Sequence, residues 1–276
     1  MTTLAHSRQG TGPPLVLIHF LGGSRAAWDP VIPALAERFD VIAVDLPGFG
    51  DSAPVPPDVE PHPAFLAATV AQLLDQLGVD QPHVAGNSLG GWIALELAQL
   101  RPVASLTLFA PAGLWSGRTP LYCRVSLRAT RWACRRAPRV LSRLVAHRLG
   151  RTLVLAQGHG RPARMTPDQA REEIHAMGTA RGFDATLAAT LRRHYTAGRP
   201  VDAPVTVAFG SRDRILLRRQ SRHRGQLPPD ARSAVLPGCG HVPMTDDPGA
   251  VAELIRSTAT AAKSAVHSPA LRSNVP

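Results

Sequence analysis

One short turn in the sequence combines residue types that suit nucleophilic catalysis. Gly86-Asn87-Ser88-Leu89-Gly90 is a Gly-x-Ser-x-Gly pattern that follows a short apolar run and opens a segment with helical periodicity. A serine on so sharp a turn needs small neighbours on both sides, and glycines provide them. The N-terminus of the following helix adds free N–H groups and the positive end of its dipole. The pattern therefore predicts that Ser88 is a nucleophile held above a sheet.

A serine nucleophile needs a base, and the base needs a partner that orients it. His241 lies among glycines directly after a short apolar run, and Asp213 also follows a buried run. Taken singly, His241 could be structural, and Asp213 could simply pair with Arg212 or Arg214. The chain order Ser88, Asp213, His241 is one in which nucleophile, acid and base are known to occur. We therefore predict that these three residues act together.

Acyl transfer also needs N–H donors for the negative oxygen that forms on the substrate. The backbone N–H of Leu89, directly after the serine, is one expected donor. The second should come from the loop 19–24, which follows the first buried run. Gly22 and Gly23 in this loop permit close approach of the backbone.

Continuous apolar runs separated by helical segments surround these clusters. Such alternation is typical of a parallel sheet with helices on both faces, so the sequence predicts an α/β fold. The expected strands lie at 14–19, 41–44, 84–85, 105–109, 204–209 and 233–236, and the expected helices within 27–39, 63–77, 89–99 and 251–262.

The segment 112–200 breaks this alternation and consists of helical pieces divided by prolines and glycines. We expect the α/β core at 1–111 and 201–262, with an all-helical insertion at 112–200. The tail 263–276 is expected to be disordered.

The positive charge of the chain is concentrated in the same segment. The whole chain has 31 Lys and Arg against 20 Asp and Glu, a net charge of +11. Residues 112–200 hold 17 arginines and four acidic residues, a net charge of +13. This surface is either merely solvated or docks an anionic partner, such as an acidic carrier protein, a membrane or a charged substrate. No nucleic-acid-binding motif accompanies the charge, so we expect no nucleic acid partner.

Arginine spacing within the insertion indicates a helix. Arg124, Arg128, Arg131 and Arg135 follow 4-3-4 spacing, which places them on one helix face. We interpret this face as solvated.

The remaining composition excludes several classes of protein. Hydrophobic residues make up 44% of the chain, which is globular composition, and no apolar run reaches the ~18 residues of a membrane span. The three cysteines, Cys123, Cys134 and Cys239, have no metal-ligand spacing and cannot form a disulfide framework, which indicates a reducing, cytoplasmic compartment. The histidines of the insertion also lack ligand spacing, and we interpret them as structural or surface residues: His147, His159, His175 and His194.

Together the clusters resemble the α/β-hydrolase superfamily, and within it the capped serine hydrolases. These include esterases, lactonases, cofactor-free haloperoxidases and carbon–carbon-bond hydrolases. The resemblance covers about residues 13–110 and 204–261, and the turn 45–52 matches a structural turn of the family. It implies that the insertion 112–200 takes the place of a helical cap.

The chain departs from the family pattern in several places. The usual glycine after the loop histidine is Phe20 here, so by position Leu21 is the expected second oxyanion donor. Residues 1–12 leave little room for the first antiparallel strands, and an edge strand is expected to be missing. A serine nucleophile disfavours the dehalogenase and epoxide-hydrolase branches. Asn87, beside Ser88, resembles the residue that carbon–carbon-bond hydrolases have at this position. The loop 22–24, however, lacks the Gly-Pro-Gly of those enzymes. This difference favours ester or thioester cleavage.

We therefore predict a serine hydrolase that cleaves a carboxylic ester or thioester through an acyl-serine, with a small acyl substrate and no metal or organic cofactor. Lactone opening, carbon–carbon-bond cleavage and cofactor-free perhydrolysis stay open, as does a non-catalytic binding protein on this scaffold. A basic cap that docks an acidic carrier protein would suit an editing thioesterase. The oligomeric state is open. Phe20, Trp115, Tyr122 and Trp132 are the predicted substrate-binding side chains.

Overall fold

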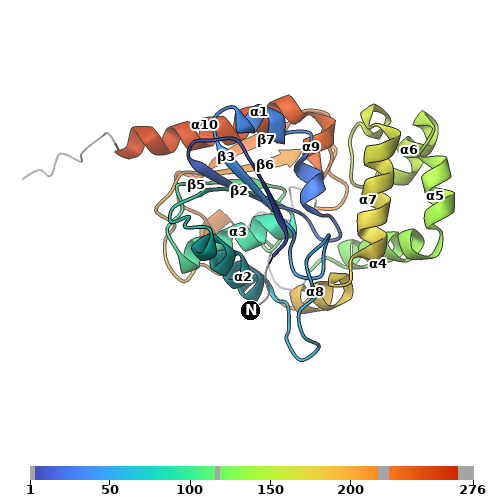
Figure 1. Cartoon of the computed structure of the whole chain (residues 1–276), viewed down its shortest axis with the longest axis horizontal. Coiled ribbons are helices and arrows are strands. Elements are labelled where there is room, and N and C mark those ends of the chain that lie inside the picture. The colour runs from blue at the N-terminus through green and yellow to red at the C-terminus, as the bar shows by residue number, and fades with distance from the viewer. Residues whose placement is uncertain (1–3, 116–118, 217–223, 267–276) are drawn as a thin grey trace, which may run out of the picture.

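The centre of the fold is a seven-stranded sheet with the order β1-β3-β2-β4-β5-β6-β7 in the described part of the chain (Figure 1). The computed structural model describes residues 4–115, 119–216 and 224–266. Every neighbouring pair is parallel except β1 with β3, so the predicted, mostly parallel α/β sheet is confirmed. The strands are β1 (His6–Gln9), β2 (Pro14–Ile18), β3 (Asp40–Val44), β4 (His83–Asn87), β5 (Ser105–Phe109), β6 (Val205–Gly210) and β7 (Arg232–Leu236).

Helices cover both faces of this sheet. Figure 1 shows α1 and α10 on one face and α2 and α3 on the other. These helices are α1 (Ile32–Ala36), α2 (Pro63–Gln76), α3 (Leu89–Leu100) and α10 (Pro248–Val266).

Alternate side chains of β2 reach opposite faces of the sheet, as the two-residue period of a strand requires. Leu15 and Leu17 belong to the buried cluster that includes the side chains of α1 and α10. Val16 and Ile18 belong to the cluster that includes α2 and α3. The apolar run is continuous because both faces of the strand are covered.

Five α-helices lie between β5 and β6 within the described residues: α4 (Leu121–Arg136), α5 (Pro138–Leu144), α6 (Arg148–Leu155), α7 (Pro167–Thr179) and α8 (Phe183–Thr190). We call residues 121–190 the helical insertion. In Figure 1, α5 and α6 lie on the side of α7 that faces away from the sheet. A capping box between Thr166 and Gln169 begins α7.

The arginine face predicted on α4 is not entirely solvated. Arg131 is buried, and its guanidinium donates to the carbonyl oxygens of Met177 and Ala180 at the end of α7. It also lies over the Phe183 ring, 5.6 Å from the ring centroid. Burial lowers the Arg131 pKa, and the nearby Arg135 adds to this. The interpretation of Arg131 as a solvated residue was wrong, because α4 packs closely against the end of α7.

The expectation of a missing edge strand also needs correction. His6–Gln9 forms the antiparallel edge strand β1, paired with β3. A side-chain pair also joins these strands, because the Arg8 guanidinium donates to the Asp40 carboxylate at 2.6 Å and 2.9 Å. The strand has no apolar run because only one edge and part of one face are covered.

The last helix is longer than expected. Its end at Val266 makes residues 263–266 helical rather than disordered, while the rest of the predicted tail lies outside the described residues. None of the helices in the described chain combines the length and apolar character needed to cross a membrane.

Candidate active site

Ser88 lies on a strained turn between the last residue of β4 and the first residue of α3. Its backbone has φ 56° and ψ −114°, in the left-handed region that non-glycine residues avoid. Only glycine fits at the two positions that flank this turn, Gly86 and Gly90. A Cβ at Gly86 would lie 2.2 Å from the Gly90 carbonyl oxygen, and one at Gly90 would lie 2.2 Å from the Ile18 oxygen of β2. The turn therefore packs tightly against β2 and holds Ser88 at the carboxyl end of the sheet.

His241 and Asp213 form a buried pair at the same end of the sheet. Nδ1 of His241 lies 2.9 Å from Oδ2 of Asp213. The other carboxylate oxygen accepts the N–H groups of Ile215 and Leu216 at 2.8 Å and 2.9 Å. Since a carboxylate only accepts, we assign a proton to Nδ1 of His241, which leaves the Nε2 lone pair of the neutral ring available as a base.

Ser88 and His241 line one cavity of about 70 Å³, which we call the inner cavity. No hydrogen bond joins their side chains among the described residues. The oxyanion loop contributes Phe20 and Leu21 to its wall, and the helical insertion contributes further residues. The wall residues from the insertion are Leu127, Thr130, Val154, Leu155, Gln157, Gly158, Glu173 and Met177.

The backbone N–H groups of Leu21 and Leu89, near Ser88, have no hydrogen-bond partner in the part of the chain that the structure describes. Leu89 is the first residue of α3, so its N–H has no partner inside the helix. Leu21 belongs to the loop after β2 and lines the inner cavity with Ser88. Both groups are suited to bind an oxygen that acquires negative charge.

The direction of the Leu21 N–H is fixed by the carbonyl on the other side of its peptide bond. The Phe20 oxygen lies 2.7 Å from Nδ1 of His19 and accepts the Gly23 N–H at 3.0 Å. His19 Nε2 accepts the N–H of Leu46 at 3.0 Å, so its proton is assigned to Nδ1. Burial lowers the His19 pKa, which keeps the ring neutral. In a trans peptide the N–H points opposite to the C=O, so this network sets the orientation of the donor.

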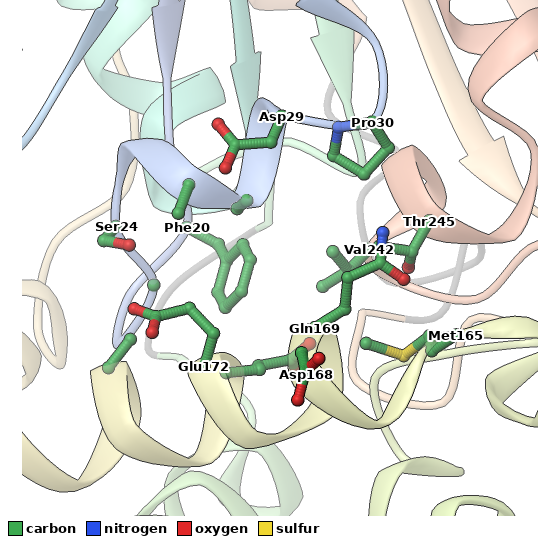
Figure 2. Close-up of a pocket in the computed structure, with 15 residues that line it drawn as sticks. Phe20, Ser24, Asp29, Pro30, Met165, Asp168, Gln169, Glu172, Val242 and Thr245 are labelled. Atoms are coloured by element: carbon green, nitrogen blue, oxygen red, sulfur yellow. The ribbon is translucent and has the colours of Figure 1, made fainter. Parts of the chain in front are cut away.

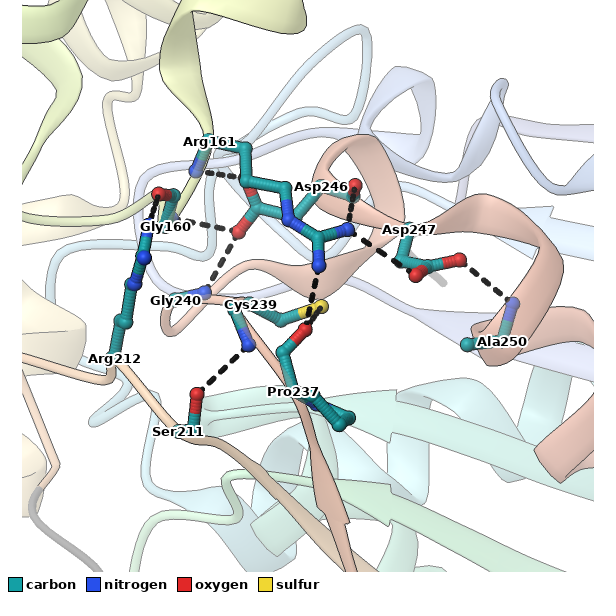
Figure 3. Close-up of polar contacts among 11 residues, drawn as sticks. Gly160, Arg161, Ser211, Arg212, Pro237, Cys239, Gly240, Asp246, Asp247 and Ala250 are labelled. Atoms are coloured by element: carbon teal, nitrogen blue, oxygen red, sulfur yellow. Dashed lines mark hydrogen bonds and ion pairs between the residues drawn. The ribbon is translucent and has the colours of Figure 1, made fainter.

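The sequence analysis missed Asp246, which ties the loop of His241 to the helical insertion (Figure 3). Asp246 ends the short helix α9 (Pro243–Asp246) and is buried. One carboxylate oxygen accepts the N–H groups of Gly160 and Gly240, and the other accepts that of Arg161, each at 2.7 Å. Gly240 precedes His241, so a buried charge positions the loop of the candidate base. In the sequence, Asp246-Asp247-Pro248 is typical of the start of a helix, so it does not indicate this role.

A cysteine links α4 to the loop of the candidate acid. Sγ of Cys123 donates to the Ile215 oxygen at 2.8 Å. Burial and the charge of Asp213 raise the Cys123 pKa to about 11, so the thiol stays protonated and able to donate. Cys134 and Cys239 are also free and buried. Within the described residues, no three His, Cys, Asp or Glu side chains come together as metal ligands.

A larger pocket of about 310 Å³, which we call the outer pocket, lies beside the inner cavity (Figure 2). It is bounded by the 3-10 helix Arg25–Trp28 on one side and by α7 on the other. Phe20, Glu173 and Val242 line both spaces, so they lie at the junction between them.

The outer pocket is lined by carboxylates and by apolar side chains. The carboxylates belong to Asp29, Asp168, Glu172 and Glu173, and none of the lining residues is Lys, Arg or His. Burial raises the Asp29 pKa, and the charge of Glu172 adds to this against the opposing effect of Arg25. The lining therefore contains acidic side chains and no basic ones.

His159 holds the Glu173 carboxylate at the junction of the two spaces. Nε2 of His159 lies 2.7 Å from the Glu173 carboxylate, and Nδ1 lies 2.9 Å from the Thr245 hydroxyl. Burial opposes protonation of His159, but Glu173 and the charge of Asp246 outweigh it and raise the His159 pKa. This histidine joins the insertion to the core, in keeping with its interpretation as a structural residue.

The four predicted substrate-binding side chains lie in different places. Phe20 lines both spaces. Trp115 is buried but lines neither: it packs edge-on against Trp92, with ring centroids 5.7 Å apart. Tyr122 and Trp132 are 57% and 64% exposed and line neither space. Their predicted role needs correction, because α4 turns them outward.

The family model of the alpha/beta hydrolase family matches residues 15–254, so the chain belongs to this family. A pimeloyl-[acyl-carrier protein] methyl ester esterase of Aeromonas hydrophila is 42% identical over 121 residues, which cover 41% of this chain and 46% of that protein. The chain therefore spans about half the length of this relative.

Two further comparisons cover most of the chain. Epoxide hydrolase EphH of Mycobacterium tuberculosis is 34% identical over 202 residues, which cover 70% of this chain and 93% of that protein. The solved structure of a thermophilic esterase from Thermogutta terrifontis superposes with a TM-score of 0.75 at 22% identity, covering 94% of this chain and 93% of the other. This last likeness supports the fold. The family match and the relative from Mycobacterium tuberculosis therefore agree on the alpha/beta hydrolase family.

Proposed function

We propose that the protein is a serine hydrolase that cleaves a carboxylic ester through an acyl-serine intermediate. One observation carries the proposal: the strained Ser88 and the Asp213–His241 pair meet at the inner cavity. Nucleophile, base and orienting acid are the parts that acyl transfer to water requires.

In the proposed reaction, Ser88 Oγ attacks the ester carbonyl carbon while Nε2 of His241 takes the hydroxyl proton. Asp213 keeps the imidazole oriented and stabilises its charged form. The N–H groups of Leu21 and Leu89 bind the negative oxygen, a contribution on the order of 3 kcal/mol for each donor. His241 then gives the proton to the departing alcohol, and a water deprotonated by His241 releases the acid from Ser88.

The relatives support ester cleavage more than epoxide opening. One relative is a methyl ester esterase by name, and another is an epoxide hydrolase by name. A serine that opens an epoxide would form an ether, which water does not readily hydrolyse, whereas an acyl-serine is an ester and turns over. The residue at the turn is Ser88, so the proposed substrate is a carboxylic ester.

The inner cavity and the outer pocket support a prediction about the size and charge of the substrate. The inner cavity of about 70 Å³ suits a short acyl group, and the outer pocket of about 310 Å³ suits the rest of the ester. The carboxylates of the outer pocket repel a negative group there. We therefore expect neutral or cationic esters to be cleaved faster than anionic esters of the same size.

The test is covalent labelling with a serine-directed fluorophosphonate, followed by mass spectrometry of the labelled peptide. The native chain should be labelled on Ser88, and Ser88→Ala should lose the label. Ser257→Ala, on α10 and distant from the turn, is the matched control and should label like the native chain. A folded native chain that stays unlabelled, or label retained in Ser88→Ala, would refute the proposal and favour a binding protein.

A further inference from the structure

The outer side of the helical insertion exposes many large apolar side chains. Of the ten most exposed large hydrophobic residues in the described chain, eight lie between residues 121 and 153. Leu153, Leu149 and Trp132 are 74%, 70% and 64% exposed. Isolated exposed leucines are ordinary, but a concentration on three consecutive helices indicates an interaction surface.

On α4 the exposed apolar residues form one face, opposite the face that lines the inner cavity. At 100° per residue, Leu121, Val125 and Trp132 lie within about 40° of one another around the helix. Leu127 and Thr130, which line the inner cavity, lie on the opposite side. The inward face accounts for the packing of this helix, and the outward face has no partner among the residues that the structure describes.

The next two helices repeat this arrangement. On α6, Leu149 and Leu153 are one turn apart and exposed, while Val154 and Leu155 line the inner cavity. Between α4 and α6, α5 contacts both helices and buries none of its own side chains fully. We call the exposed side chains of α4, α5 and α6 the outer face.

Arginines surround these apolar side chains. Residues 121–153 contain nine arginines and no aspartate or glutamate. Arg131 and Arg151 are buried, but six others are exposed, and none of the six has an ion-pair partner in the described part of the chain. The exposed arginines are Arg128, Arg135, Arg136, Arg139, Arg143 and Arg148.

We propose that the outer face docks the protein onto the surface of an anionic lipid bilayer. Leucine and valine side chains enter the boundary between headgroups and acyl chains, and arginines around them bind lipid phosphates. Trp132 suits the headgroup level, where tryptophan concentrates in membrane proteins. Of the docked helices, α5 and α6 lie on the side of α7 away from the sheet (Figure 1), so docking through them leaves the α/β core clear of the bilayer.

A lipid surface explains the outer face better than an acidic protein does. An acidic protein would pair with the arginines, but it would leave the highly exposed leucines without an apolar partner. Phospholipids supply phosphate and hydrocarbon at the depth that each kind of side chain reaches.

The first test measures co-sedimentation with vesicles of phosphatidylcholine alone and of phosphatidylcholine mixed equally with phosphatidylglycerol. It uses Ser88→Ala throughout, so that binding is independent of any hydrolysis. We expect binding to the anionic vesicles that is weakened at least about tenfold by Leu149→Ser with Leu153→Ser. The matched control replaces two exposed apolar residues elsewhere, Leu100→Ser with Val235→Ser, and should bind like the parent.

The second test uses the natural tryptophans and needs no destabilising change. The chain has four tryptophans, and Trp28, Trp92 and Trp115 are buried, so a change in emission on adding vesicles reports Trp132. Anionic vesicles should shift the emission to shorter wavelength and protect it from an aqueous quencher. Trp132→Phe should abolish the shift.

A third test measures the contribution of the arginines to vesicle binding. It compares the double variant Arg135→Gln with Arg136→Gln to a control, Arg38→Gln with Arg232→Gln, that removes the same charge elsewhere. The first pair should bind anionic vesicles more weakly and with less dependence on salt than the control pair. Absence of vesicle binding together with an unchanged tryptophan emission would overturn the proposal. Equal binding by the outer-face and control variants would also overturn it, and binding to an acidic carrier protein alone would assign the face to a protein partner.

Discussion

Replacement of Asp246 by asparagine should strongly destabilise the fold, because the carboxylate is buried and accepts three backbone N–H groups at 2.7 Å. An asparagine has one acceptor oxygen, which can serve Gly160 and Gly240 together. Its NH₂ group would then face the Arg161 N–H, leaving a buried donor unpaired at a cost of about 1–3 kcal/mol. The two remaining bonds lose their charge, at about 1 kcal/mol each.

These contributions give an expected loss of about 3–5 kcal/mol in the free energy of unfolding for Asp246→Asn. Asp247→Asn is the matched control. Asp247 is partly exposed, accepts the Ala250 N–H at 3.1 Å and pairs with Arg161 at 3.3 Å. Asparagine caps a helix as well as aspartate does, and an exposed ion pair contributes about 0–1 kcal/mol.

Urea unfolding followed by intrinsic fluorescence measures both variants. The rate of fluorophosphonate labelling, measured on protein that is still folded, reports whether the loop of His241 has moved. Asp246→Asn should label more slowly than Asp247→Asn. Unfolding free energies that agree within about 1 kcal/mol between the two variants would refute the role of Asp246 in joining the loop of His241 to the helical insertion.

The pKa of His159 is raised in the fold, so its partner Glu173 should stabilise the protein most at low pH. That stabilisation is present below the unfolded value of about 6.5 and is lost as pH rises through the folded value. Glu173→Gln should therefore lower the unfolding free energy more at about pH 5.5 than at about pH 9, and equal losses would contradict this. Arg131→Ala leaves the Met177 carbonyl without this donor and the Ala180 carbonyl with only the Phe183 N–H at 3.4 Å, and should cost about 2–4 kcal/mol. Arg128→Ala, exposed on the same helix, should change stability by less than about 0.5 kcal/mol in urea unfolding.

The sheet and the turn of Ser88 could be predicted because their signals are local. A strand buried on both faces is a continuous apolar run, and a strained turn against a neighbouring strand requires glycine. Asp213 and His241 were selected for a similar reason, since each lies a few residues after an apolar run, although the run before His241 forms the largely exposed strand β7. The edge strand His6–Gln9 has no such signal, because its side chains are mostly polar and its stability comes from pairing with β3.

Contacts between distant segments could not be predicted in this way. Asp246 accepts hydrogen bonds from residues more than eighty positions earlier in the chain, and nothing in its own neighbourhood indicates them. Arg131 follows the spacing of a solvated helix face, but the end of α7 covers it. Tyr122 and Trp132 are aromatic and belong to the same helix as residues that line the inner cavity. The orientation of α4 about its axis, however, places Leu127 and Thr130 in the cavity wall instead.

The position of the helical insertion has a consequence for the order in which the parts emerge during synthesis. β5 ends at Phe109 and its neighbour β6 begins at Val205, about a hundred residues later. At about 5–20 residues per second, the edge of β5 stays unpaired for roughly 5–20 s on the ribosome. An unpaired edge can pair with another chain, so this interval exposes the nascent protein to aggregation. During the same interval the nascent chain holds its strained serine but neither the acid nor the base, so in the proposed mechanism the nucleophile gains its reactivity only when synthesis of the core is nearly complete.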